Sequence, residues 1–188
     1  VRRFAEAGVG RNLQARAAGE RAVRGYFESE GFLEVATPAA VPCPGLDLHL
    51  DAFGVANTKR PRWLSTSPEF QMKRLLVGGI ARCFQLARCF RNGELGERHE
   101  PEFTMLEWYR AWSDGATIVE DTEGIIEAVA RAVTGSATLE VHGRRIAIAR
   151  PFERITVAEA FERAAGIDAD ECLRLANEDE DRFFRVLV

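Results

Sequence analysis

Two apolar runs separated by a polar segment constrain the fold of this chain more than any other feature. Residues 81–91 (ARCFQLARCFR) and 102–112 (EFTMLEWYRAW) are rich in the residue types that strands favour. The ten residues between them, NGELGERHEP, contain two glycines and are polar, which is typical of a hairpin loop. We therefore predict a long antiparallel hairpin. Most hairpin loops have about two to five residues, so a loop of this length indicates a functional role.

Helical patterns on both sides of this hairpin predict an α+β fold, an antiparallel sheet flanked by helices. Apolar side chains recur at helical spacing in residues 12–30, with Asn12 as the expected N-cap and Gly31 after the end. Residues 118–133 carry a second apolar stripe of this kind. Ser67-Pro68-Glu69 is typical of a helix start, with a capping hydroxyl, a proline in the first turn and a carboxylate near the positive end of the helix dipole.

Shorter elements are expected elsewhere. Residues 32–36 and 46–53 read as strands, the second because leucines alternate with polar residues. The polar face of that second segment, Asp47, His49 and Asp51, is interpreted as solvated rather than as a metal site, because residues two apart on one strand do not enclose an ion. A hairpin around His142-Gly143, a capping box at 156–159 and helical segments up to residue 188 follow.

Composition limits the classes of protein to consider. With 188 residues, 46% of them hydrophobic, the chain can form one globular domain with its own core. The formal net charge of -4 gives no general attraction to polyanions, so a nucleic-acid role would require a local basic patch. No apolar run is long enough to predict a membrane span, and four cysteines without a CxxC pair favour a cytoplasmic location.

Glu107 is the candidate ligand for a cation. In the second strand it lies on the same side as Tyr109 and three apolar residues. A carboxylate withdrawn from water requires a cation or several hydrogen bonds, so this pair is suited to receive a bound ammonium group. The strand pattern alone, however, favours an internal ion pair, with Arg88 or Arg74 as the partner.

Two further charged residues lie at the ends of predicted elements. Arg91 closes the first strand, where a guanidinium can clamp a phosphate or a carboxylate through two parallel hydrogen bonds, although most loop arginines are merely solvated. Glu69 could bind a substrate amine, although the helix dipole is the ordinary explanation for a carboxylate in a first turn.

The order and spacing of three segments carry a family resemblance. The run EGFLEVATP (residues 30–38) resembles motif 1 of the class II aminoacyl-tRNA synthetases, and CFRNGELGERHEPEFTMLEWYR (residues 89–110) resembles motif 2. With LSTSPEFQMKRLLVGG (residues 64–79) between them, they resemble the lysyl branch of that class. Within this branch PEFTMLEWYR, with Trp108, is most similar to the elongation factor P lysine ligases, which are truncated lysyl-tRNA synthetase homologues.

The resemblance implies roles for particular residues. Ser67, Pro68 and Glu69 would bind lysine, with Glu69 at its α-amino end, and Glu107 and Tyr109 would line the pocket for its side chain. Arg91 would be the catalytic residue, bridging the substrate carboxylate and the α-phosphate of ATP. The residues implied in ATP binding are Arg91, Asn92, Gly93, Arg98, His99 and Glu100.

The resemblance also implies an activity and partners. We expect ATP-dependent, Mg²⁺-dependent activation of lysine or β-lysine as an adenylate, followed by ligation to a lysine side chain of elongation factor P, in a homodimer formed through the motif 1 helix and strand. The third motif of the class and its Mg²⁺-binding acidic residues are not recognisable, so we expect a single catalytic domain over residues 1–188, incomplete at the C-terminus and without metal ligands.

Two other functions stay open. One is a lysyl-tRNA synthetase core that aminoacylates tRNA, which the net negative charge disfavours. The other is a catalytically silent paralogue that serves as a dimerising or regulatory module. It is motivated by Gly93 and Glu100, because the family usually has Glu and Asn at these positions near the adenine of ATP.

Overall fold

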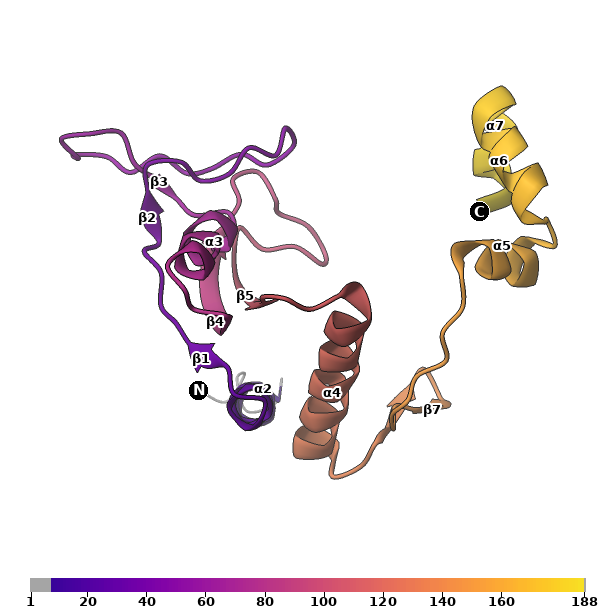
Figure 1. The fold of residues 1–188 in the computed structure, drawn as a ribbon, viewed down its shortest axis with the longest axis horizontal. Helices are drawn as coiled ribbons and strands as arrows, with labels where there is room; N and C mark the ends of the chain where they lie inside the picture. The colour runs from indigo at the N-terminus through magenta and orange to yellow at the C-terminus, as the bar shows by residue number, and fades with distance from the viewer. Residues whose placement is uncertain (1–7, 188) are drawn as a thin grey trace. The chain divides into compact units, whose positions relative to one another are not determined.

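The computed structural model describes residues 8–187, and the chain divides after Arg150 into two compact units (Figure 1). The first contains every site residue proposed above. The second, from Pro151 onward, consists of α5 (Val157–Ala165), α6 (Ala169–Glu178) and α7 (Glu180–Leu187). The expectation of one catalytic domain over the whole chain stays a prediction.

The predicted hairpin is confirmed. Strands β4 (Arg82–Phe90) and β5 (Glu102–Arg110) pair antiparallel along their full length, from Arg82 opposite Arg110 to Phe90 opposite Glu102. Because side chains alternate along a strand, this register puts Leu106 and Trp108 on one face of β5 and Glu107 and Tyr109 on the other. The hairpin thus separates a core face from a site face.

The α+β class and the antiparallel pairing of β4 with β5 are as predicted, but the sheet is mixed, so the prediction of an antiparallel sheet is wrong for one strand pair. Strand β1 (Leu33–Glu34) joins the other edge of β4 in parallel, with Leu33 opposite Cys83. A parallel pair needs a long crossover connection. The residues between β1 and β4 supply it, and they include the helix α3 (Glu69–Val77).

Two long helices pack together and against the core face. They are α2 (Val9–Ser29) and α4 (Gly115–Thr134), and Phe27 of α2 is fully buried, stacked on Phe84 with ring centroids 4.5 Å apart. Leu106 and Trp108 pack against the same cluster.

Helix α2 begins earlier than predicted. Its N-cap is Gly8, which has φ 70°. The Asn12 backbone N–H donates to the Gly8 carbonyl, so Asn12 lies within the first turn and is not the cap.

The prediction of a strand over residues 46–53 is wrong. This segment is a loop with a turn at residues 48–49, and Leu46 and Leu48 are 77% and 94% exposed. Alternation alone cannot make a strand without a partner edge, and the neighbouring short strands β2 (Ala40–Val41) and β3 (Trp63–Leu64) pair with each other. The segment joins the rest of the sheet region through an isolated bridge of Asp51 with Asn92 and a backbone bond from Leu64 to the Phe53 carbonyl.

The remaining expected elements are present. Strands β6 (Thr138–Val141) and β7 (Arg144–Ala147) form the hairpin around His142-Gly143, where both residues have positive φ. Thr156 and Glu159 form the reciprocal capping box of α5. None of the helices in residues 8–187 is long and apolar enough to cross a membrane.

The closest approach of α2 and α4 gives a stability prediction. A Cβ atom on Gly124 of α4 would lie 2.3 Å from Cε2 of Tyr26, so Gly124→Ala should destabilise the protein by about 1–3 kcal/mol through overpacking. Gly25→Ala in α2 is the matched control, because its Cβ would meet nothing within 4 Å and the substitution should stabilise the helix by about 0.5–1 kcal/mol. Urea unfolding measures both changes, and equal effects of the two substitutions would contradict this helix contact.

Candidate active site

Glu107 lies at the centre of a hydrogen-bonded group formed by β5 and the start of α3. The hydroxyl of Ser67 donates to Oε2 of Glu107 at 2.9 Å, and the hydroxyl of Tyr109 donates to Oε1 at 2.5 Å. The pKa of Tyr109 is raised, mainly by burial and to a lesser extent by this hydrogen bond and the negative charge of Glu107. The Tyr109 hydroxyl therefore keeps its proton and remains a donor. Each carboxylate oxygen therefore has one neutral donor.

No Lys or Arg side chain of residues 8–187 forms an ion pair with Glu107. The two arginines considered as internal partners point elsewhere: Arg88 pairs with Glu102 at 3.3 Å, and Arg74 donates to Gln71 at 3.3 Å. A half-buried carboxylate with hydroxyl partners alone keeps most of its capacity to attract a cation. The group is thus suited to an external ammonium ion.

Ser67 also sets the start of α3. Its hydroxyl oxygen accepts from the Glu69 backbone N–H at 3.2 Å, which satisfies one of the free donors at the helix start. The N-cap is Pro68, so the predicted start, with Ser67 as the cap and Pro68 in the first turn, is wrong by one residue. Ser67 and Glu69 line a pocket of about 220 Å³, together with Thr66, Phe70 and residues 44–47. Glu69 forms an ion pair with Lys73, so an ammonium group bound at Glu69 would share the carboxylate with that lysine.

Arg91 follows β4 and lies over the ring of Phe103, with its Cζ 5.1 Å from the ring centroid. Its Nε donates to the Thr66 carbonyl at 3.4 Å, its Nη1 forms an ion pair with Oε1 of Glu94 at 3.8 Å, and its side chain is 23% exposed. Stacking on an aromatic ring holds a guanidinium plane in place, and an anion bound at Arg91 would share the guanidinium with Glu94. Sequence reasoning did not identify Phe103 or Glu94 as neighbours of Arg91.

The β4–β5 loop gathers several of the expected ATP residues into one pocket. This pocket has a volume of about 190 Å³ and is lined by Arg91, Glu94, Arg98, His99, Glu100 and Phe103. Asn92 and Gly93 lie at the beginning of the same loop, where the Asn92 backbone donates to the Asp51 carbonyl at 2.8 Å. Gly93 has φ 81°, a conformation that glycine adopts without strain.

Phe103 and Glu107 link the two parts of the site. They lie on one face of β5, four residues apart, which corresponds to about 13 Å along a strand. Arg91 lies over the first residue of this pair, and the two hydroxyl donors surround the second. An elongated molecule with an acidic end and a cationic end fits this separation of charges.

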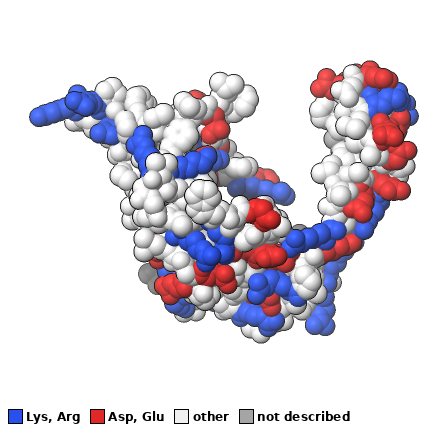
Figure 2. All heavy atoms as spheres, in the orientation of Figure 1, with Lys and Arg blue, Asp and Glu red and all other residues white. Residues whose placement is uncertain are grey.

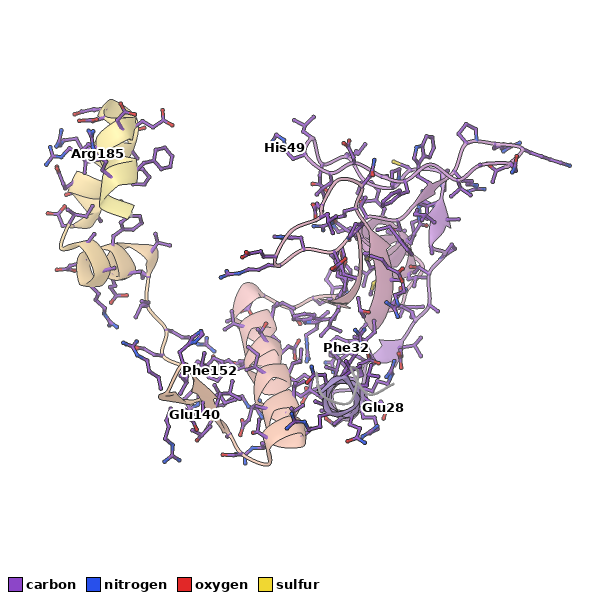
Figure 3. All side chains as sticks on the ribbon, turned by 180° about the vertical axis from the view of Figure 1, so that it is seen from behind. Glu28, Phe32, His49, Glu140, Phe152 and Arg185 are labelled. Atoms are coloured by element: carbon purple, nitrogen blue, oxygen red, sulfur yellow. The ribbon has the colours of Figure 1, made fainter. Side chains whose placement is uncertain are left out.

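The described residues do not fit a resident metal ion. They contain no group of three or more His, Cys, Asp or Glu side chains placed to hold one. His49 lies on the exposed loop before β3 (Figure 3), and it forms no such group with Asp47 and Asp51.

Cys89 is a buried neighbour of the site that the sequence did not single out. It lies on β4 opposite Phe103, and its environment includes the charges of both Glu107 and Arg91. Burial, with a smaller contribution from Glu107, raises the pKa of the Cys89 thiol to about 11. The thiol is therefore uncharged near neutral pH and behaves as an apolar packing group beneath the site.

Comparison with known proteins identifies the family. Residues 2–187 match the family described as tRNA synthetases class II (D, K and N). This chain belongs to that family. The match extends over both compact units, and it includes every residue of the hairpin and of the site.

Similar curated proteins within the family are named as lysine–tRNA ligases. The chain is 38% identical over 149 residues to that of Neisseria gonorrhoeae (strain NCCP11945), covering 76% of this chain and 29% of the relative. It is 36% identical over 157 residues to that of Dechloromonas aromatica, covering 80% and 30%, and 39% identical over 150 residues to that of Methylobacillus flagellatus, covering 77% and 28%. The chain thus spans less than a third of the length of these relatives.

Thiol labelling tests the packing beneath the site. Because its pKa is about 11 against an ordinary value of 9.0, Cys89 should carry about 100-fold less thiolate than an unperturbed cysteine, and it is also buried. With iodoacetamide at about pH 7.5, the exposed Cys43 should be alkylated first, and Cys89 only after unfolding. Mass spectrometry of the labelled peptides measures the order, and early labelling of Cys89 in folded protein would contradict the hairpin packing.

Proposed function

We propose that this protein activates lysine or β-lysine with ATP and transfers the lysyl group to a lysine side chain of elongation factor P. The observation that carries the proposal is the Glu107 carboxylate, which has two hydroxyl donors and no cationic partner among residues 8–187. The ε-ammonium group of lysine supplies the missing charge. The lysine–tRNA ligase names of the relatives support the same amino acid.

The site residues would place lysine along β5. Its side-chain ammonium group would contact Glu107, with Ser67 and Tyr109 holding the carboxylate in position. Its carboxylate would lie toward Arg91, and its α-amino group toward Glu69. Fixing both charged ends of the molecule orients the carboxylate, which lowers the entropic part of the barrier.

The first chemical step would join this carboxylate to the nucleotide. A carboxylate oxygen attacks the α-phosphorus of ATP, the bond from this phosphorus to the bridging oxygen breaks, and pyrophosphate leaves. Negative charge grows on the phosphoryl oxygens, and the Arg91 guanidinium neutralises it. Arg98 and His99 line the loop pocket beside Arg91, where they would contact the outer phosphates or the base.

The second step would transfer the lysyl group. A neutral amine of the acceptor attacks the carbonyl carbon of the adenylate, a C–N bond forms, and AMP leaves as the C–O bond breaks, with the extra amine proton released to solvent. No protein nucleophile is needed, which agrees with the uncharged state of Cys89.

Two observations bear on the acceptor. The strand PEFTMLEWYR with Trp108 supports elongation factor P, as in the ligases that the sequence resembles. The names of the curated relatives support the other candidate, tRNA.

A homodimer through α2 and β1 is part of the proposal. It is supported by Leu13 and Leu33 on these elements, whose side chains are 61% and 54% exposed.

The first experiment measures lysine-dependent exchange of pyrophosphate into ATP by the full-length protein. Glu107→Gln should lower kcat/KM for lysine by about 30- to 160-fold, the effect of losing a charged partner worth about 2–3 kcal/mol, with ATP binding unchanged. Glu102→Gln is the matched control, since it removes a carboxylate from the same strand that is 56% exposed. Absence of exchange with any amino acid would instead identify a silent paralogue, and normal lysine use by Glu107→Gln would refute the pocket.

The second experiment identifies the acceptor. The full-length protein is incubated with ATP, labelled lysine, elongation factor P and tRNA together, and the products are separated by size. We expect label on elongation factor P, in a bond stable to mild base because it is an amide. Label on tRNA alone, released by base as an ester, would overturn the proposed acceptor.

A further inference from the structure

A basic hairpin whose second arm includes β3 projects from the first unit. Residues 53–64 run out and back, with backbone bonds from Val55 to Arg62 and from Leu64 to Phe53, and we call them the basic hairpin. Asn57 has φ 60° near the turn, and residues 56–61 are all exposed. Figure 2 shows Lys and Arg side chains gathered at the end of this projection.

The cations of the basic hairpin are not neutralised within the described chain. Lys59, Arg60 and Arg62 form no ion pair with any acidic side chain of residues 8–187, and the nearby Arg74 donates to the neutral Gln71 at 3.3 Å. Some arginines elsewhere are paired, as Arg131 is with Glu127 at 2.7 Å, whereas Arg144 and Arg145 of the β6–β7 hairpin form no ion pair among the described residues either. In a chain of net charge -4, this hairpin is therefore a local concentration of unpaired positive charge.

A pocket of about 570 Å³ lies at the base of the basic hairpin. Proline, alanine and valine side chains form much of its wall, and two guanidinium groups border it; its lining is Pro38, Ala40, Val41, Pro42, Thr58, Arg62, Gln71 and Arg74. An apolar wall with a cationic border matches a protein segment that carries apolar and acidic side chains together. A phosphodiester backbone would match a continuous polar and basic track instead.

Helix α3 lies between this pocket and the candidate active site. Glu69 and Phe70 line the pocket on the active-site side, whereas Gln71 and Arg74 line the pocket beside the basic hairpin. The two pockets are thus separated by one helix, whose diameter with side chains is about 10–12 Å. A protein bound at the basic hairpin therefore lies about one helix diameter from the candidate active site.

We propose that the basic hairpin and the pocket at its base dock an acidic, partly apolar surface of the protein that accepts the lysyl group. The proposal rests on the proposed function in taking the acceptor to be a protein. Opposite charges on the two surfaces accelerate encounter and fix orientation, and the apolar wall supplies contact area once the two proteins meet.

The test compares two double variants of the full-length protein. Lys59→Gln/Arg60→Gln removes two charges from the tip of the basic hairpin, and Arg144→Gln/Arg145→Gln removes two from the exposed β6–β7 hairpin of the same unit. Binding of fluorescently labelled elongation factor P is measured by anisotropy at about 50 mM and about 500 mM salt. We expect the first variant to weaken binding about tenfold at low salt and less at high salt, with the second unchanged.

Separate readouts distinguish the failure of this proposal from that of the proposed function. Equal binding by both variants and the unmodified protein, or no binding of elongation factor P, overturns the docking surface whatever the catalytic result. A basic-hairpin variant that loses binding of unmodified tRNA but keeps that of elongation factor P also overturns it, in favour of an RNA surface. Lysine-dependent pyrophosphate exchange, which should be unchanged in both variants, tests the proposed function alone.

Discussion

The carboxylate of Glu107 is held by two neutral hydroxyl groups, and the account of this protein depends on that arrangement. Ser67 and Tyr109 fix the position of both oxygens without cancelling their charge. An arginine in their place would have made Glu107 a structural ion pair. The hydroxyls give the opposite result, an oriented negative group in the second half of β5, while the Arg91 guanidinium lies over Phe103 near the start of the strand.

The opposite face of the same strand explains how β5 is kept in place. Arg110 donates through both Nε and an Nη atom to Asp121 of α4, at 3.1 and 2.7 Å, and the side chains are 8% and 2% exposed. Tyr26 of α2 donates to the same carboxylate at 3.0 Å. A buried pair is stabilising only when its geometry and hydrogen bonds are complete, and this one links β5 to both long helices. The strand therefore has one anchored face and one face available for ligands.

The sequence predicts the parts of the fold that follow from local chemistry. The hairpin and the capping box of α5 each depend on residues close in the chain, and the structure has both. Helix α3 is also present, but it begins one residue later than predicted, with Pro68 rather than Ser67 as the N-cap. The failures involve distant partners. Residues 46–53 alternate but find no strand edge, and β1 joins β4 in parallel through a crossover that no local pattern reveals. The same limit applies to Arg91, whose contacts with Phe103 and Thr66 depend on strand register and loop path.

A crystal structure of the protein with lysine and a non-hydrolysable ATP analogue would show whether Glu107 receives the lysine side chain, through the position of the lysine Nζ atom. We expect Nζ within hydrogen-bond distance of the Glu107 carboxylate, with the lysine carboxylate directed toward Arg91. A lysine bound with Nζ elsewhere, or a Glu107 paired with an arginine of the protein in that complex, would contradict this expectation.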